Sequence, residues 1–221
     1  MNPEPDAKSS AVLFAALSII TMVAGYIGIL SWPSRGGVDY LLPASYLVLG
    51  VLIKFGDQAY DEGIFSRRTA FLLAFPSGIL LGVLMALDNG TATIAIGLLL
   101  SLMLAGKYDN HGFVAGFLIS ITISVMAMIY GLATPSLIGI VLVGIASYID
   151  EWADGKGESC SGIVSRLLCQ RPFLKVMVLF LCVFGILDSY LYFLIFLSFD
   201  FGYSFMDYYS RNIKEGAHGP L

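Results

Sequence analysis

Apolar runs without a single charged residue recur along this chain and restrict what it can fold into. They cover 11–34, 69–87, 112–149 and 176–187. About 20 apolar residues in a helix are enough to cross the hydrocarbon core of a bilayer. Only 13% of the residues are charged and 57% are hydrophobic, whereas soluble domains carry about 25% charged residues. The sequence therefore predicts an all-α, polytopic transmembrane helix bundle in the cell membrane.

The breaks between apolar runs contain Gly, Pro, Asn or Asp, which end helices and make turns. They divide the chain into a leader at 1–10, a transmembrane domain at 11–199 with a cytoplasmic loop at 150–172, and an aromatic interfacial tail at 200–221 that we expect to be partly disordered. Seven spans are predicted: 11–31, 40–55, 69–88, 91–106, 112–132, 134–149 and 173–199. The first run has no basic flank or cleavage site, so we expect a retained helix rather than a signal peptide.

The distribution of Lys and Arg predicts an N-in, C-out orientation, because positive residues favour the cytoplasmic side. The inner flanks then hold Lys8, Lys54, Arg67, Arg68, Lys107, Lys156, Arg166, Arg171 and Lys175. The outer flanks hold Arg35, Arg211 and Lys214. The net charge is −4 and no long basic block occurs, so we expect the lipid bilayer and not nucleic acid as the partner.

Three inward-running helices end in related acidic signatures. They are Gly56-Asp-Gln-Ala-Tyr-Asp-Glu-Gly63, Gly106-Lys-Tyr-Asp-Asn-His-Gly112 and Tyr148-Ile-Asp-Glu-Trp-Ala-Asp-Gly155. This similarity suggests a pseudo-repeat of three hairpins, a pattern that in membrane proteins is often associated with a site between the repeats. Gly78-x-x-x-Gly82 and Gly112-x-x-x-Gly116 have the spacing of close helix contacts.

The carboxylates of these signatures form a candidate metal site. Asp57 and Asp61 are four residues apart, as are Asp150 and Asp154, so each pair shares a helix face if its helix continues one turn beyond the apolar run. Such oxygen ligands suit Mg²⁺ or Mn²⁺ together with a substrate phosphate. Asp109 is a further candidate ligand, and Arg67, Arg68 and Arg166 are candidate phosphate-binding residues. The simpler interpretation is that these acids only keep loop ends in water.

Two local motifs resemble known families. Asp57-Gln-Ala-Tyr-Asp61 is similar to the aspartate-rich signature of UbiA-type prenyltransferases, and this resemblance implies diphosphate binding through Mg²⁺. The chain has only part of the family's Asn-Asp-x-x-Asp-x-x-x-Asp pattern. Its seven predicted spans are also fewer than the nine helices of that family. The run from Asp61 to Arg67 resembles part of the CDP-alcohol phosphotransferase signature, with Glu62 intruding before Gly63. Each resemblance covers under a tenth of the chain.

A broader resemblance is to uncharacterised archaeal multi-span membrane proteins. It is carried by Gly106-Lys-Tyr-Asp-Asn110, Ile149-Asp-Glu151, Arg171-Pro172 and Ser198-Phe-Asp-Phe-Gly-Tyr203. It implies the same fold class and no particular activity.

Asp188 differs from the other acids because it falls inside the predicted helix 173–199. An ionisable residue at that depth is expensive and indicates a functional site. Asp88 precedes the fourth helix and is expected to cap it or to bind an ion at the outer side.

Three functions remain open from the sequence. The first is a divalent-cation-dependent enzyme acting on a lipid phosphate or diphosphate, for which no nucleophile can be named. The second is a cation- or proton-coupled transporter that uses Asp188. The third is a structural membrane subunit.

Overall fold

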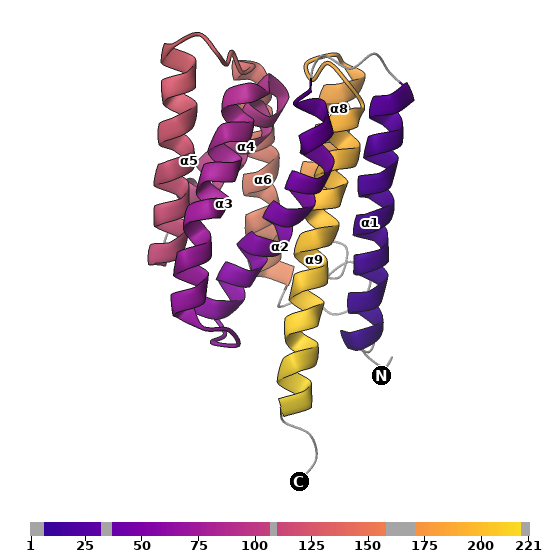
Figure 1. Cartoon of the computed structure of the whole chain (residues 1–221), viewed down its shortest axis with the longest axis vertical. Coiled ribbons are helices and arrows are strands. Elements are labelled where there is room, and N and C mark those ends of the chain that lie inside the picture. The colour runs from indigo at the N-terminus through magenta and orange to yellow at the C-terminus, as the bar shows by residue number, and fades with distance from the viewer. Residues whose placement is uncertain (1–6, 32–36, 107–109, 158–170, 218–221) are drawn as a thin grey trace. The chain divides into compact units, whose positions relative to one another are not determined.

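The computed structural model describes residues 7–31, 37–106, 110–157 and 171–217, with only the backbone given at 7, 31, 154–157 and 216–217. The described residues form helices and no strand, which confirms the all-α prediction. The helices are α1 (Ala7–Ser31), η1 (Asp39–Leu41), α2 (Leu42–Tyr60), α3 (Arg67–Leu87), α4 (Asn89–Leu104), α5 (His111–Ile129), α6 (Leu137–Gly157), α8 (Pro172–Val183) and α9 (Leu191–Ala217) (Figure 1).

Four segments of the described residues are long and apolar enough to cross a membrane: Lys8–Leu30, Asp39–Tyr60, Arg67–Leu87 and His111–Ile129. Helices α4 and α8 are apolar but shorter. Large apolar side chains such as Ile20, Leu72 and Ile129 are more than half exposed, far beyond what a soluble surface usually offers. These are the properties of an integral membrane protein.

The predicted last span, 173–199, is wrong. The chain forms two helices there, α8 and α9, separated by a turn at 184–190. Gly185 adopts a left-handed φ of +69° after α8, and the Leu191 amide donates to Ser189 Oγ at 3.1 Å at the start of α9. The described residues therefore contain eight α-helices rather than seven.

The predicted tail is also helical rather than irregular, because α9 continues to Ala217. Similarly, α6 extends through Gly157, into the predicted loop 150–172. In the signatures at 56–63 and 106–112 the chain turns at a glycine with a left-handed φ, Gly63 in the first and Gly106 in the second. In the signature at 148–155 helix α6 instead continues past Gly155. The three helix ends of the pseudo-repeat are thus not equivalent.

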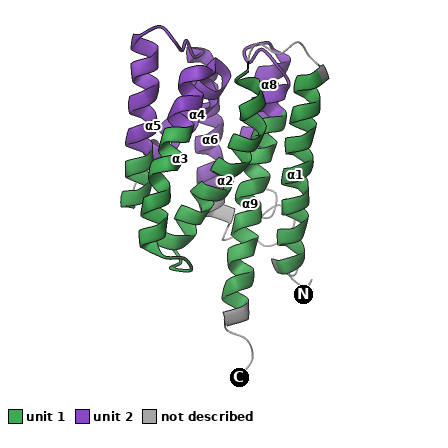
Figure 2. Ribbon diagram, in the orientation of Figure 1, with its two compact units in different colours: residues 1–80, 110–116, 194–221 green, residues 81–109, 117–193 purple. Residues whose placement is uncertain are grey.

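The chain divides into two compact units (Figure 2). Unit 1 comprises Met1–Leu80, Asn110–Gly116 and Leu194–Leu221, and unit 2 comprises Leu81–Asp109 and Phe117–Phe193. We describe each unit by itself.

In unit 1, α1, α2 and most of α9 lie side by side (Figure 1). Two glycines bring α2 and α9 into backbone contact. A Cβ added to Gly50 would meet the Phe199 carbonyl oxygen, and one added to Gly202 would lie 2.9 Å from the Leu47 carbonyl oxygen. Small residues of this kind allow close helix approach in membranes. The polar residues one to two turns farther along both helices are consequently close together.

A second close approach in unit 1 joins α3 to α5. A Cβ on Gly78 would lie 2.6 Å from the Gly116 carbonyl oxygen, so no larger residue fits without a backbone shift. The contact uses one glycine from each of the two predicted small-residue motifs, and it confirms the prediction for this pair.

The end of α9 lies beside the start of α1. Phe14 stacks on Tyr208 with a centroid distance of 5.3 Å, and it also contacts Phe201 at 6.1 Å. The last residues of the described chain therefore lie at the end of unit 1 where α1 begins. Seven spans predict the opposite arrangement, with the two termini at different ends.

In unit 2, α4 packs against α6. Its core contains Met85, Ala92, Ala95, Ile96 and Leu99. Ser101 and Ser147, both buried, share a hydrogen bond of 2.6 Å between these two helices. Helix α4 is capped at its start by Asp88, whose Oδ2 accepts from the Thr91 amide at 2.6 Å, and the predicted capping role is confirmed.

Candidate functional site

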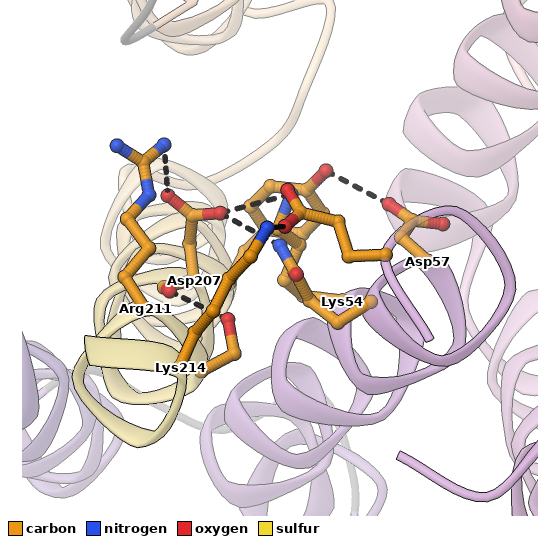
Figure 3. Close-up of polar contacts among 9 residues, drawn as sticks. Lys54, Asp57, Asp207, Arg211 and Lys214 are labelled. Carbon is orange, nitrogen blue, oxygen red and sulfur yellow. Dashed lines mark hydrogen bonds and ion pairs between the residues drawn. The ribbon is translucent and has the colours of Figure 1, made fainter. Parts of the chain in front are cut away.

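A polar seam lies between the last two turns of α2 and the C-terminal half of α9, within unit 1 (Figure 3). We define this α2–α9 seam by Lys54, Asp57, Gln58, Asp61 and Glu62 of α2 and its cap, and by Tyr203, Asp207, Arg211 and Lys214 of α9. Lys54, Asp57, Gln58 and Asp61 have the i, i+3, i+4, i+7 spacing of one helix face. One face of α2 and its cap therefore carries four of the five residues on this side of the seam.

Asp207 is the centre of the seam. Its Oδ1 lies 3.1 Å from Lys54 Nζ and accepts from Gln58 Nε2 at 3.0 Å, while its Oδ2 lies 2.8 Å from Arg211 Nη2. The side chains of Lys54 and Asp207 are 16% and 17% exposed. Because both charges are largely removed from water, the pairing matters more than it does for a surface ion pair.

Asp57 is held from the opposite helix by an aromatic side chain. Tyr203 donates its hydroxyl to Asp57 Oδ2 at 2.9 Å. The ammonium of Lys54 also lies 4.9 Å from the centroid of the Tyr203 ring, a cation–π distance. Tyr203 thus positions one carboxylate and one ammonium of α2 at once.

The outer edge of the seam is an exposed ion pair. Lys214 Nζ lies 2.7 Å from Glu62 Oε2, with side-chain exposures of 54% and 41%. Solvent screens this pair strongly, so its contribution to stability is small. Arg211, whose side chain is 60% exposed, is the other exposed cation at this edge, where it pairs with Asp207.

Asp61 follows directly after α2. It occupies the C-cap position, and its amide donates to the Asp57 carbonyl at 2.8 Å. The helix thus continues beyond the apolar run, and the expectation that Asp57 and Asp61 share one face is confirmed. Asp61 is exposed to solvent, in contrast to its neighbour Gln58, which is only 4% exposed.

The two described arginines proposed for phosphate binding lie at the start of α3. Arg67 Nη2 donates to the Tyr60 carbonyl at 3.2 Å, and its guanidinium lies 6.0 Å from the Tyr60 ring centroid. Arg68 is exposed. Arg67 is therefore partly engaged in closing the α2–α3 turn.

Asp150 has a different environment, in unit 2. It is 1% exposed, and its two oxygens accept from the Phe173 amide at 3.1 Å and the Leu174 amide at 2.7 Å. The next residue, Glu151, pairs with Arg171 at 3.0 Å. Asp150 therefore satisfies the first amides of α8, as a helix cap does, and Glu151 binds the residue that precedes that helix.

Three other predicted site residues are not described by their side chains. Asp109 and Arg166 lie outside the described residues, and Asp154 is known only by its backbone, within α6. Asp188 is described, but the prediction of a deep helical position is wrong. It lies in the turn between α8 and α9 and is exposed.

The α9 half of the seam is not predicted by the sequence, which indicates an interfacial tail at 200–221. The signal was present. Tyr203, Asp207 and Arg211 are spaced four residues apart, the spacing of one helix face, and Lys214 follows three residues later.

The donor set fits a hard cation only at the Asp57–Asp61 end. The described residues contain no group of three or more His, Cys, Asp and Glu side chains that could hold a metal ion. Mg²⁺, however, commonly binds through one or two carboxylates, several waters and a substrate phosphate. Two carboxylates on one helix face satisfy that requirement.

Comparison with known proteins adds no assignment. No family model matches the chain, and neither a curated protein nor a solved structure is significantly similar to it.

Proposed function

We propose that this chain is a multi-pass cell-membrane protein with both termini in the cytoplasm. The even number of helices in the described residues and the proximity of Phe14 to Tyr208 support this topology. Charge distribution supports it as well. With eight crossings, every Lys and Arg of the sequence except Arg35 falls at a cytoplasmic helix end or loop, a stronger bias than seven spans give.

At the cytoplasmic rim, we propose a site for a phosphorylated lipid that depends on a divalent cation, Mg²⁺ or Mn²⁺. The observation that carries this proposal is the α2–α9 seam, where carboxylates and cations gather at the end of an apolar helix. Asp57 and Asp61 would hold the cation, and Arg211 and Lys214, which are 60% and 54% exposed, would contact the phosphate together with Arg68.

The other polar residues of the seam have supporting roles in this proposal. Tyr203 orients Asp57 through its hydroxyl, and Asp207 holds Lys54 and Arg211 between the two helices. When bound, the metal would supply Lewis-acid stabilisation of charge on the phosphate, as in metal-dependent phosphoryl transfer. The proposal includes an enzymatic reaction at the lipid phosphate, in which a substrate group or water would be the nucleophile.

Asp150 is left out of the proposed metal site, because both of its oxygens accept amide hydrogen bonds from α8. Transport through Asp188 loses its main support, since that residue lies in an exposed turn.

Mn²⁺ binding tests the proposal. The protein is reconstituted in nanodiscs of phosphatidylcholine with or without phosphatidic acid, and bound Mn²⁺ is measured by electron paramagnetic resonance. We expect saturable binding that tightens with phosphatidic acid and is lost in Asp57→Asn and in Asp61→Asn. Asp39→Asn, in η1 just before the start of α2, is the matched control and should bind as wild type. Equal Mn²⁺ binding by wild type and Asp57→Asn would overturn the proposal.

A further inference from the structure

Gln58 is the most deeply buried polar side chain of the α2–α9 seam. It is 4% exposed, and its Nε2 donates to Asp207 Oδ1 at 3.0 Å. Its other terminal atom, Oε1, accepts no hydrogen bond from any residue that the structure describes. Buried polar atoms in native proteins nearly always have a hydrogen-bond partner or a ligand, so we expect this oxygen to bind one.

The orientation of the amide is fixed by its neighbour. Reversing it would place Oε1 against the Asp207 carboxylate, so that two acceptors would face each other. Because Nε2 is committed to Asp207, Oε1 points away from that residue. The unsatisfied atom is therefore the oxygen and not the amide nitrogen.

The nearest acidic positions on the same helix are those of the proposed cation site. Gln58 follows Asp57 directly and precedes Asp61 by three residues, and all three lie on the face of α2 that also carries Lys54. Lys54 and Arg211 each pair with Asp207, and Lys214 pairs with Glu62.

We propose that Gln58 Oε1 is a third oxygen ligand of the cation bound by Asp57 and Asp61. This inference rests on the proposed function and deepens it. Two carboxylates and one neutral amide oxygen form an all-oxygen set, which favours hard cations such as Mg²⁺, Mn²⁺ or Ca²⁺ over Zn²⁺ or Cu⁺. Gln58 would also tie the cation to α9, because its nitrogen binds Asp207.

Two substitutions separate a ligand from a merely structural glutamine. Gln58→Glu keeps an oxygen for the cation but loses the donor to Asp207. Gln58→Met, of similar length, loses both. If Gln58 is a ligand, Gln58→Glu retains Mn²⁺ affinity within a few-fold of wild type or tighter, although its melting temperature falls. Gln58→Met should bind Mn²⁺ more weakly by roughly tenfold or more, in the range seen when groups around a metal are altered.

The measurement is Mn²⁺ titration by electron paramagnetic resonance in nanodiscs, with thermal unfolding followed by tryptophan fluorescence on the same samples. Unchanged affinity in Gln58→Met, with binding still lost in Asp57→Asn, would overturn this inference and leave the proposed function standing; water would then be the partner of Oε1. Absence of Mn²⁺ binding in wild type would instead overturn the proposed function itself. If Gln58→Glu does not fold, the comparison of Gln58→Met with wild type decides.

Discussion

Lys54 Nζ lies 3.1 Å from Asp207 Oδ1, which joins the second helix of the chain to the last across a largely buried contact. Arg211 approaches the other oxygen of the same carboxylate at 2.8 Å. Asp207 is thus the counter-ion of two cations that α2 and α9 hold in close proximity. Several consequences of this geometry can be measured.

Asp207→Asn should destabilise the protein strongly. It removes the carboxylate that pairs with Lys54, whose side chain is only 16% exposed, and breaking a buried pair costs about 3–5 kcal/mol. Thermal unfolding in detergent measures the effect. Glu62→Gln is the control, because the exposed Glu62–Lys214 pair contributes no more than about 1 kcal/mol. Similar losses in the two variants would contradict the central role of Asp207.

Gly50→Ala should separate α2 from α9. Its new methyl group would meet the Phe199 carbonyl oxygen, and overpacking of this kind costs about 1–3 kcal/mol. Gly56→Ala, on the same helix, meets nothing within 4 Å and should be neutral or stabilising by about 0.5–1 kcal/mol. The difference between the two denaturation midpoints is the test. Equal midpoints would show that the backbones do not touch at Gly50.

Both termini should be reached from the same side of the membrane. Starting from a variant with Cys160, Cys169 and Cys182 changed to Ser, we expect Ser9→Cys and Glu215→Cys to react with a membrane-impermeant maleimide only in inverted vesicles. Gly37→Cys, between α1 and α2, should react only in right-side-out vesicles. A seven-span chain would give Glu215→Cys the labelling pattern of Gly37→Cys.

Tyr192→Phe should weaken the start of α4. The Tyr192 hydroxyl donates to Asp88 Oδ1 at 2.7 Å, and Asp88 caps that helix. Loss of a hydrogen bond to a charged group costs about 1.5–3 kcal/mol. Tyr190→Phe, two residues away and 58% exposed, is the control. An unchanged unfolding midpoint in Tyr192→Phe would show that this hydrogen bond does not stabilise the start of α4.

Asp150→Ala should affect stability and leave cation binding intact. The change removes the acceptors of the Phe173 and Leu174 amides, and the loss of a helix cap costs about 0.5–2 kcal/mol. Mn²⁺ affinity in nanodiscs should equal that of wild type. A loss of Mn²⁺ binding in Asp150→Ala would instead support the sequence-based prediction that Asp150 is a metal ligand.

The sequence correctly predicts the helices whose ends carry clear capping or turn residues. Asp88 and Asn110 mark helix starts, and Gly63 and Gly106 mark helix ends, so the elements from α1 to α5 lie close to their predicted bounds. The last predicted span fails because apolar residues continue through the break. Gly185 and Ser189, a C-terminal and an N-terminal helix signal, are the residues that divide α8 from α9.

The candidate site is predictable only in part. Asp57 and Asp61 can be placed on one face from their spacing, since that depends on a single helix. Asp207, which holds the seam together, is 149 residues away from Gln58 in the sequence. No local sequence pattern indicates that α2 and α9 pack against each other. That contact depends on backbone approach at Gly50 and Gly202, which a sequence reveals only when two helices are already known to pair.

The long separation between Gln58 and Asp207 has a consequence for biosynthesis. At about 5–20 residues per second, Gln58 is synthesised roughly 7–30 s before Asp207. During that interval Lys54, Asp57 and Gln58 lack their partners on α9. A chain that is truncated before Asp207 would insert with these polar groups exposed, and quality-control proteases would have a means of recognising it as incomplete.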